Sequence, residues 1–221
     1  MLDTLVIDLD GTIVDCAARH HACYADLARE HGLRALDAQT YWNMKRARAP
    51  WSSILAATGG GADQAGFADR FVERIELPRY LTLDRLYPGA LEALGQLRTI
   101  AESVMLVTMR RDLRQLELEL ARLGIAAAFD RVIARGAHGA PSKGDIAAPF
   151  FPSAERRIAW IGDTEEDIAS ARRFGALACA VCGGLRERRL LEGEHPDLIA
   201  ADIVAAATML EASVLSRGNP A

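Results

Sequence analysis

Short apolar runs of strand length alternate with helical segments through the C-terminal part of the chain. The predicted strands are 103–108, 131–134, 157–161, 178–181 and 198–199, and the predicted helices are 88–98, 112–123, 164–174 and 202–210. A similar apolar run, 5–7, lies near the N-terminus. Strands that alternate with helices fold as a mostly parallel sheet with helices on both faces. The pattern therefore predicts an α/β fold with a Rossmann-like core.

The segment between the first apolar run and the later ones is helical and shows no strand pattern. Helices are expected at 15–31, 37–48, 52–58 and 63–80. A chain of 221 residues exceeds the usual size of one domain but is short for two full ones. We therefore predict a Rossmann-like core over 1–14 and 87–221, an inserted helical domain over 15–86, and a loose tail from Ser216.

Composition limits the expected partners and compartment. The formal net charge is −4, so the chain has no basic field for nucleic acid. No stretch approaches the ~18 apolar residues of a membrane span and no secretory signal is visible, so we expect a cytoplasmic protein without membrane contacts. Its four cysteines are then expected to be reduced. Cys179 and Cys182 have redox or zinc spacing, but the predicted strand at 178–181 favours buried structural thiols.

Two acidic residues follow the first apolar run, in the order Asp8-Leu9-Asp10-Gly11-Thr12. Side chains two apart on a strand point the same way, so both carboxylates can address one site. Gly11 allows a sharp turn there, and ligands of open α/β sheets bind at the carboxyl ends of strands. Two like charges so close are costly unless a cation or a shared proton relieves them. The run indicates a cation site, although an acidic turn is the simpler alternative.

Three later positions fall where parallel strands would end beside Asp8. Thr108 ends the predicted strand 103–108, and Lys143, one of only two lysines, lies in the loop 135–144. Asp163 follows the strand 157–161 and precedes the run 164–167. Each has an ordinary alternative: a strand-end threonine, a surface lysine, and a capping box in which Asp167 only satisfies backbone donors.

In this order and on these elements, the residues resemble the four motifs of the haloacid dehalogenase-like hydrolase superfamily. The matches are Asp8 to Thr12, Thr108, Lys143, and the run Gly162 to Asp167. The resemblance covers nearly the whole chain, because the insertion is similar to the helical cap of that family. Phosphoglycolate phosphatase-like members are the nearest analogy. The resemblance implies a catalytic core over 1–14 and 87–221 and a cap domain over 15–86.

The resemblance also implies a role for each motif residue. Asp8 is expected to be the nucleophile, forming an aspartyl-phosphate intermediate. Asp10 is expected to protonate the leaving oxygen and then to accept a proton from the hydrolytic water. Thr108 would hydrogen-bond the transferring phosphoryl group, and Lys143 would neutralise the clustered charges. Expected contacts to the substrate are Gly11, Thr108, Met109, Arg110 and Lys143.

A magnesium site follows from the same resemblance, since Mg²⁺ favours carboxylate oxygens and substrate phosphate. The expected metal ligands are Asp8, the backbone carbonyl of Asp10, and Asp163. Asp167 either belongs to this set or supports it by holding Lys143, and the sequence leaves that choice open.

The sequence therefore predicts a Mg²⁺-dependent phosphomonoester hydrolase that acts on a small phosphorylated metabolite. A sugar phosphomutase of the same superfamily would use the same residues, and a catalytically idle phospho-ligand binding protein would keep the fold. Asp10 argues against the idle protein, because mere binding needs no acid beside the nucleophile. In the insertion, Lys45, Arg46 and Arg48 are candidate contacts for an anionic leaving group, or else a solvated basic face. The physiological substrate and the oligomeric state are not indicated.

Overall fold

The computed structural model describes residues 1–59, 64–136, 142–151 and 157–217. Its contacts divide the chain into two compact units, one of Met1–Val14 with Leu86–Ala221 and one of Asp15–Arg85. The predicted boundary at residue 86 differs from this division by one residue. Two short strands, β2 (Val14–Asp15) and β3 (Arg85–Leu86), pair where the chain enters and leaves the second unit.

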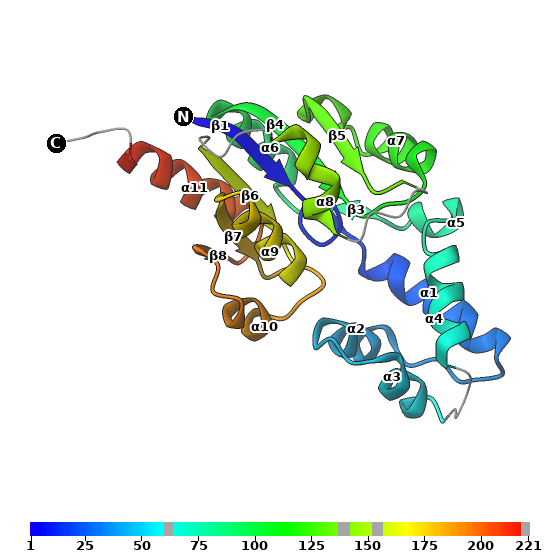
Figure 1. The fold of residues 1–221 in the computed structure, drawn as a ribbon. Coiled ribbons are helices and arrows are strands. Elements are labelled where there is room, and N and C mark those ends of the chain that lie inside the picture. Colours follow the sequence, from blue (N-terminus) through cyan, green and yellow to red (C-terminus); the bar gives the residue numbers. More distant parts are fainter. Residues whose placement is uncertain (60–63, 137–141, 152–156, 218–221) are drawn as a thin grey trace. The chain divides into compact units, whose positions relative to one another are not determined.

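The first unit is built on a six-stranded sheet with the order β5-β4-β1-β6-β7-β8 (Figure 1). Every pairing is parallel. Strand β1 lies between β4 and β6, and its Ile7 is in register with Leu106 and Ile161. The predicted Rossmann-like α/β core is confirmed. The strands are β1 (Leu2–Ile7), β4 (Ala101–Thr108), β5 (Arg131–Ala134), β6 (Ile158–Gly162), β7 (Leu177–Val181) and β8 (Leu198–Ala200).

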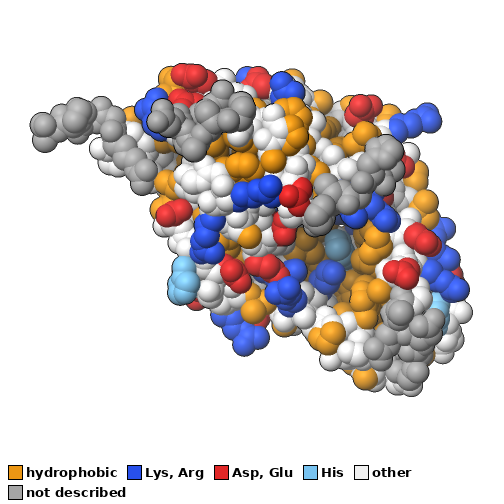
Figure 2. Space-filling view, viewed as in Figure 1, with side chains coloured by type: hydrophobic (Ala, Val, Ile, Leu, Met, Phe, Trp, Pro, Cys, Tyr) orange, Lys and Arg blue, Asp and Glu red, His pale blue; other side chains and the backbone are white. Residues whose placement is uncertain are grey.

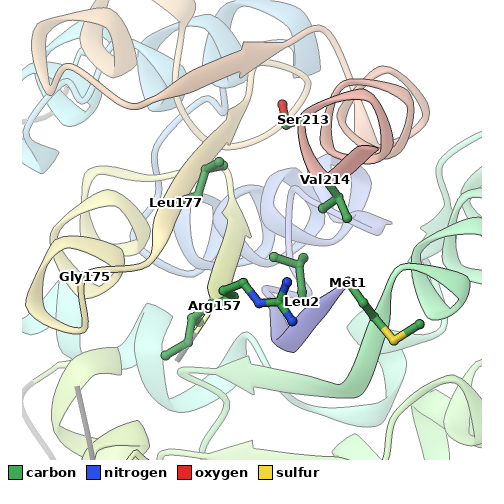
Figure 3. Close-up of a pocket in the computed structure, with 8 residues that line it drawn as sticks. Met1, Leu2, Arg157, Gly175, Leu177, Ser213 and Val214 are labelled. Atoms are coloured by element: carbon green, nitrogen blue, oxygen red, sulfur yellow. The ribbon is translucent and has the colours of Figure 1, made fainter. Parts of the chain in front are cut away.

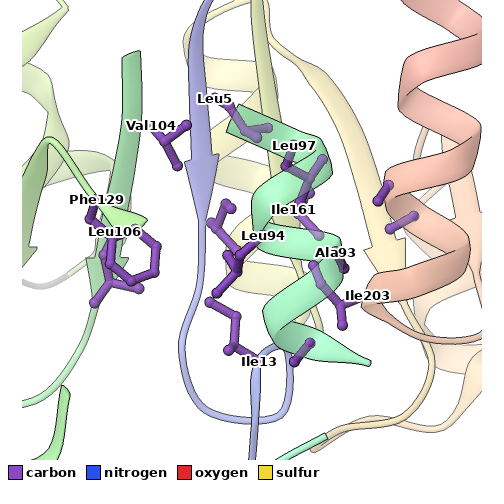
Figure 4. Close-up of a cluster of buried hydrophobic side chains, with 14 of the residues drawn as sticks. Leu5, Ile13, Ala93, Leu94, Leu97, Val104, Leu106, Phe129, Ile161 and Ile203 are labelled. Carbon is purple, nitrogen blue, oxygen red and sulfur yellow. The ribbon is translucent and has the colours of Figure 1, made fainter. Parts of the chain in front are cut away.

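Side chains alternate between the two faces of this sheet, as a strand requires. Leu5 and Ile7 of β1 belong to one buried cluster with α6 (Ala90–Thr99), α7 (Leu113–Arg122) and α11 (Ile203–Arg217). Figure 4 shows side chains of α6 lying among those of the strands. Val6 belongs to the cluster on the other face, with α8 (Lys143–Ala147), α9 (Glu165–Arg173) and α10 (Arg188–Gly193). Helices therefore cover both faces of the sheet.

The second unit is helical and has a core of its own. The rings of Tyr24 and Tyr41 stack at its centre, with centroids 4.3 Å apart. Asp37 caps α2 by accepting a hydrogen bond from the Thr40 amide. Its helices are α1 (Ala17–Glu30), α2 (Ala38–Arg46), α3 (Trp51–Ala57), α4 (Gln64–Arg74) and α5 (Pro78–Leu81).

Some predicted elements are wrong. The single helix expected at 63–80 is two helices, because Pro78 has no amide hydrogen and disfavours helical geometry in the residue before it. The tail expected to be loose from Ser216 is helical through Arg217, and 218–221 lie outside the described residues. The loop expected to reach residue 144 ends at α8, which begins at Lys143, and 137–141 are not described. Helix α10 and the strands β2 and β3 were not predicted.

The surface and the cysteines bear on the expected class of protein. No helix in the described ranges is long and apolar enough to cross a membrane. Acidic and basic side chains are interspersed on the face that Figure 2 shows. None of the four cysteines, all of which lie in the described ranges, forms a disulfide. Burial raises the pKa of Cys179 to about 12, so its thiol stays protonated and poorly reactive, as a structural thiol should.

Candidate active site

Four side chains that the sequence predicts to be functional lie at the carboxyl edge of the sheet because of where its strands end. Asp8 directly follows β1, and its amide donates a hydrogen bond to the Ile161 carbonyl of β6 at 2.9 Å. Asp163 directly follows β6, and Thr108 is the last residue of β4. Lys143 begins α8. All four side chains are buried.

Lys143 joins two of the carboxylates. Its Nζ lies 2.6 Å from Asp8 Oδ1 and 2.7 Å from Asp167 Oδ1. The Lys143 backbone amide also donates to Glu166 Oε1 at 2.8 Å, which fixes the start of α8 against α9. The lysine is therefore part of the acid cluster and not a solvated surface residue.

Asp167 has several partners besides Lys143. Its Oδ2 accepts hydrogen bonds from the amide and the hydroxyl of Thr164, the N-cap of α9, at 3.2 and 2.6 Å. Its Oδ1 also accepts from the indole nitrogen of Trp160 at 3.2 Å. The capping box is thus present, and the same side chain holds Lys143. These contacts engage both Asp167 oxygens with protein donors.

Carboxylate oxygens of Asp8, Asp163 and Asp167 lie within 4.8 Å of one another. The Asp163 Oδ2 accepts the Leu185 amide, whereas its Oδ1 is buried and has no hydrogen-bond partner among the described residues. Three carboxylates here face one ammonium, Lys143, which leaves an excess of negative charge when all are ionised. Hard oxygen donors, an orphaned buried oxygen and an excess of anions fit a divalent cation such as Mg²⁺.

Two glycines leave space for the Asp163 side chain. A Cβ added to Gly11 or to Gly184 would collide with the Asp163 carboxylate. Gly11 also has a φ of +82°, a conformation that other residues adopt only with strain. The turn after β1 and the loop after β7 therefore pack directly on this carboxylate, and only glycine fits at both positions.

Burial dominates the ionisation of the cluster. It raises the pKa of Asp8 to about 7, with Lys143 opposing the shift and Asp167 adding to it. Burial also raises the pKa of Asp163 well above its usual range, and the charges of Asp8 and Asp167 add to the effect. Burial disfavours the Lys143 ammonium, but Asp167 and Asp8 outweigh it and hold the lysine pKa above its ordinary value.

These shifts predict how metal binding responds to pH. The folded, metal-free protein holds the Asp8 proton up to about pH 7, whereas the unfolded chain releases it near 3.8. Asp8 therefore lowers the free energy of unfolding as pH rises through that window, by on the order of 4 kcal/mol in all. Because Mg²⁺ needs the ionised form, we expect its thermal stabilisation of the protein to be larger at about pH 7.5 than at about pH 5.5.

The measurement is the melting temperature with and without Mg²⁺ at both pH values. At each pH, the melting temperature without Mg²⁺ is subtracted from that with Mg²⁺. The subtraction cancels the contributions of groups whose pKa shifts have the opposite sign, such as Asp26 and Asp130. In Asp8→Asn the Mg²⁺ effect should shrink, and the pH dependence that is left should come from Asp163, whose pKa burial also raises. An equal Mg²⁺ effect at both pH values in the wild type would contradict the assignment of Asp8 as a metal ligand.

Asp10 does not share the acid cluster through its side chain. The Arg110 Nε and Nη2 donate hydrogen bonds to Asp10 Oδ2 and Oδ1 at 2.6 and 2.8 Å, in a bidentate pair. The Arg110 Nη1 lies 3.0 Å from Glu119 Oε2 on α7. Arg110, which the sequence predicts as a substrate contact, is thus directed at Asp10, the residue predicted to act as both acid and base.

The remaining predicted contacts lie close by in the chain. Thr108 Oγ1 accepts the Arg110 amide at 3.4 Å, and Met109 between them is half-buried. Sequence reasoning missed Glu119, although its position three residues after Leu116 places it on the buried face of α7. It also missed the hydrogen bond from the Leu185 amide to Asp163. The adjacent glycines are the sequence feature that points to a close approach of the backbone there.

The basic residues predicted in the insertion lie on or just after α2. Lys45 Nζ is 5.9 Å from the Trp51 ring centroid and 5.7 Å from that of Phe71, in cation–π range. Arg46 is half-buried and Arg48 is exposed. A fully buried ion pair, Arg19 Nε with Asp84 Oδ2 at 3.0 Å, also belongs to this unit.

A separate cavity of about 190 Å³ lies at the opposite edge of the sheet (Figure 3). Leu2, Ile158 and Leu177, at the amino ends of their strands, line it with Arg157, Ser213 and others. It contains no acid, and α/β sheets bind ligands at the other edge. The cavity is therefore not part of the candidate active site.

The chain belongs to the haloacid dehalogenase-like hydrolase family, which it matches over residues 2–175. This confirms the resemblance found in the sequence. The six-stranded parallel sheet and the acid cluster at its carboxyl edge agree with that class of enzyme.

Individual relatives cover almost the whole chain. A phosphoglycolate phosphatase of Synechococcus elongatus is 27% identical over 219 residues, spanning 95% of this chain and 99% of that protein. One from Cereibacter sphaeroides is 28% identical over 206 residues, spanning 89% and 92%. Among solved structures, a haloacid dehalogenase-like hydrolase from Streptococcus pneumoniae has a TM-score of 0.77 at 23% identity, with 95% and 98% coverage, and supports the fold.

Proposed function

We propose that this chain is a Mg²⁺-dependent phosphomonoester hydrolase that acts on a small phosphorylated metabolite through an aspartyl-phosphate on Asp8. The observation that carries the proposal is the buried ion pair between Lys143 and Asp8, set beside the unpartnered Asp163 oxygen. Asp8 lies at a strand end, Lys143 contacts its carboxylate, and the Asp163 oxygen without a partner among the described residues lies beside them. Together these groups suit the attack of an anion on a phosphate dianion. The family to which the chain belongs supports a phosphatase.

In the first step, an Asp8 carboxylate oxygen attacks phosphorus and the bond from phosphorus to the ester oxygen breaks. Asp10 gives its proton to that oxygen, so the leaving group departs as a neutral alcohol. The Thr108 hydroxyl donates a hydrogen bond to a phosphoryl oxygen, and Lys143 offsets the charge on Asp8 and the phosphoryl group. Phosphoryl transfer depends mostly on such positioning and charge stabilisation.

In the second step, water attacks the phosphorus of the Asp8 intermediate. Asp10, now ionised, takes a proton from that water, and the bond from phosphorus to the Asp8 oxygen breaks. Inorganic phosphate leaves, and the Asp8 carboxylate and the protonated Asp10 are restored. Asp10 thus carries one proton out and back in each cycle.

Asp8, Asp163 and the Asp10 carbonyl are the proposed metal ligands, and Asp167 holds Lys143 beside them. When bound, Mg²⁺ supplies positive charge that offsets the carboxylates and the substrate phosphate. Lys143 and Asp167 then keep the Asp8 carboxylate oriented for attack.

Substrate choice is the finer part of the proposal. The relatives named phosphoglycolate phosphatase make 2-phosphoglycolate the first substrate to test. We assign the helical unit, Asp15–Arg85, the role of a cap that sets this choice. Its basic residues near Trp51 suit a leaving group with a carboxylate. A water-soluble ester of this kind is also a suitable substrate for a cytoplasmic enzyme.

The test is a panel of phosphorylated metabolites that includes 2-phosphoglycolate and hexose phosphates, assayed with Mg²⁺ for release of inorganic phosphate. We expect at least one small ester to be hydrolysed with phosphate and alcohol formed in equal amounts. Asp8→Asn protein, purified in parallel, controls for contaminating phosphatases. No release from any ester, despite binding, would favour an idle phospho-ligand protein. Isomerisation of a sugar phosphate without release would identify a phosphomutase.

A further inference from the structure

The Asp10 carboxylate is held by a buried charge pair that the two proposed steps do not use. One guanidinium, that of Arg110, donates to both Asp10 oxygens at 2.6 and 2.8 Å. The far side of the same guanidinium lies 3.0 Å from the Glu119 carboxylate. The Arg110 side chain is only 4% exposed and that of Glu119 only 2%, whereas that of Asp10 is 19% exposed.

The direction of its nitrogens separates two roles for Arg110. Its Nε and Nη2 donate to Asp10 and its Nη1 faces Glu119, so all three nitrogens are directed at protein carboxylates. A planar guanidinium that meets a carboxylate with two parallel bonds fixes its rotation as well as its position. Each carboxylate oxygen can accept at two lone pairs, so one hydrogen bond from Arg110 does not by itself prevent an oxygen from taking a proton.

We propose that Arg110 is the positioning residue of Asp10 and that Glu119 positions Arg110. This inference rests on the proposed function, because it assigns Asp10 the acid and base role. Glu119 approaches from α7, while Arg110 follows β4, so the pair ties the orientation of Asp10 to the sheet and to one of its covering helices. In this role Arg110 acts through Asp10 and need not touch the reacting atoms.

The test is a double-mutant cycle on the full-length enzyme with two substrates. One is the best alkyl phosphate of the panel, whose leaving group needs a proton, and the other is 4-nitrophenyl phosphate, whose leaving group does not. We expect Arg110→Met to lower kcat for the alkyl ester by about 10-fold or more, with a much smaller change in KM. The loss for the aryl ester in its first step should be much smaller.

The double variant Asp10→Asn with Arg110→Met should be no slower than Asp10→Asn alone, since residues that act as one unit are not additive. Additive losses, or a rise in KM equal for both substrates, would overturn the inference and make Arg110 a substrate contact. If Asp10→Asn itself keeps wild-type turnover of the alkyl ester, the acid and base role in the proposed function fails instead.

A second variant covers the case in which Arg110→Met does not fold because Glu119 is left buried without its cation. Arg110→Lys keeps a charge but cannot donate two parallel bonds, so it should show the same selective loss on the alkyl ester. Glu119→Gln should show it in weaker form. Arg114→Met, an exposed arginine on α7, serves as the matched control and should behave as wild type.

Discussion

Asp8→Asn protein is expected to fold and to release no phosphate. An amide is a poor nucleophile and a weaker metal ligand, so kcat should fall by on the order of 10⁴-fold or more. The substitution should also raise the melting temperature of the metal-free protein near neutral pH. Burial raises the pKa of Asp8 to about 7, which means that the ionised side chain costs folding free energy there. Phosphate release and thermal unfolding measure the two effects.

The matched control is Asp3→Asn, at the other end of β1. Asp3 is partly exposed and pairs with Arg157, so its loss should leave turnover unchanged and stability nearly so. Turnover near the wild-type rate in folded Asp8→Asn protein would move the nucleophile to another residue. A lower melting temperature in the same protein would mean that the ionised Asp8 stabilises the metal-free fold.

Removal of divalent metal should suppress turnover of every substrate. The excess of carboxylates around Asp8 and Asp163 repels a phosphate dianion unless a cation is present. We expect metal-stripped protein in excess chelator to lose activity by on the order of 10³-fold, a barrier increase of about 4 kcal/mol. Addition of Mg²⁺ above the chelator concentration should restore it, as followed by phosphate release.

Chelator already saturated with Mg²⁺ is the control for direct inhibition by the chelator. Asp163→Asn should need more Mg²⁺ for half-maximal activity than the wild type, since it replaces an anionic ligand with a neutral one. Full activity of the metal-stripped wild type would exclude a metal role for this acid cluster.

The sheet and the place of the candidate site at its carboxyl edge were predictable because their signals are local. A parallel strand buried on both faces is a continuous apolar run, and an acid directly after it marks the strand end, as with Asp8 and Asp163. The order of these strand ends along the chain placed Thr108 and Lys143 near them. The elements that were missed depend on distant partners: β2 and β3 have two residues each and exist only through their pairing.

The partners of the site were harder to foresee for the same reason. Glu119 lies in a helix with one other acid, the exposed Glu117, and only the packing of α7 brings Glu119 to Arg110. The support of Asp163 comes from a backbone amide, that of Leu185, and side-chain identity carries no information about it. The sequence did not decide whether Asp167 binds metal or holds Lys143, because capping, lysine pairing and membership of the acid cluster all use the same oxygens.

The pairing of β2 with β3 has a consequence for how such a protein diversifies. Since residues 14–15 and 85–86 are hydrogen-bonded neighbours, the whole stretch between them leaves and rejoins the sheet-bearing part at one point. That stretch also has its own aromatic core, whose buried residues all lie between Cys23 and Tyr80. A segment with adjoining ends and a core of its own can be replaced as one unit. Evolution can exchange or rebuild it for new ligands while the chemistry encoded at the strand ends is inherited intact.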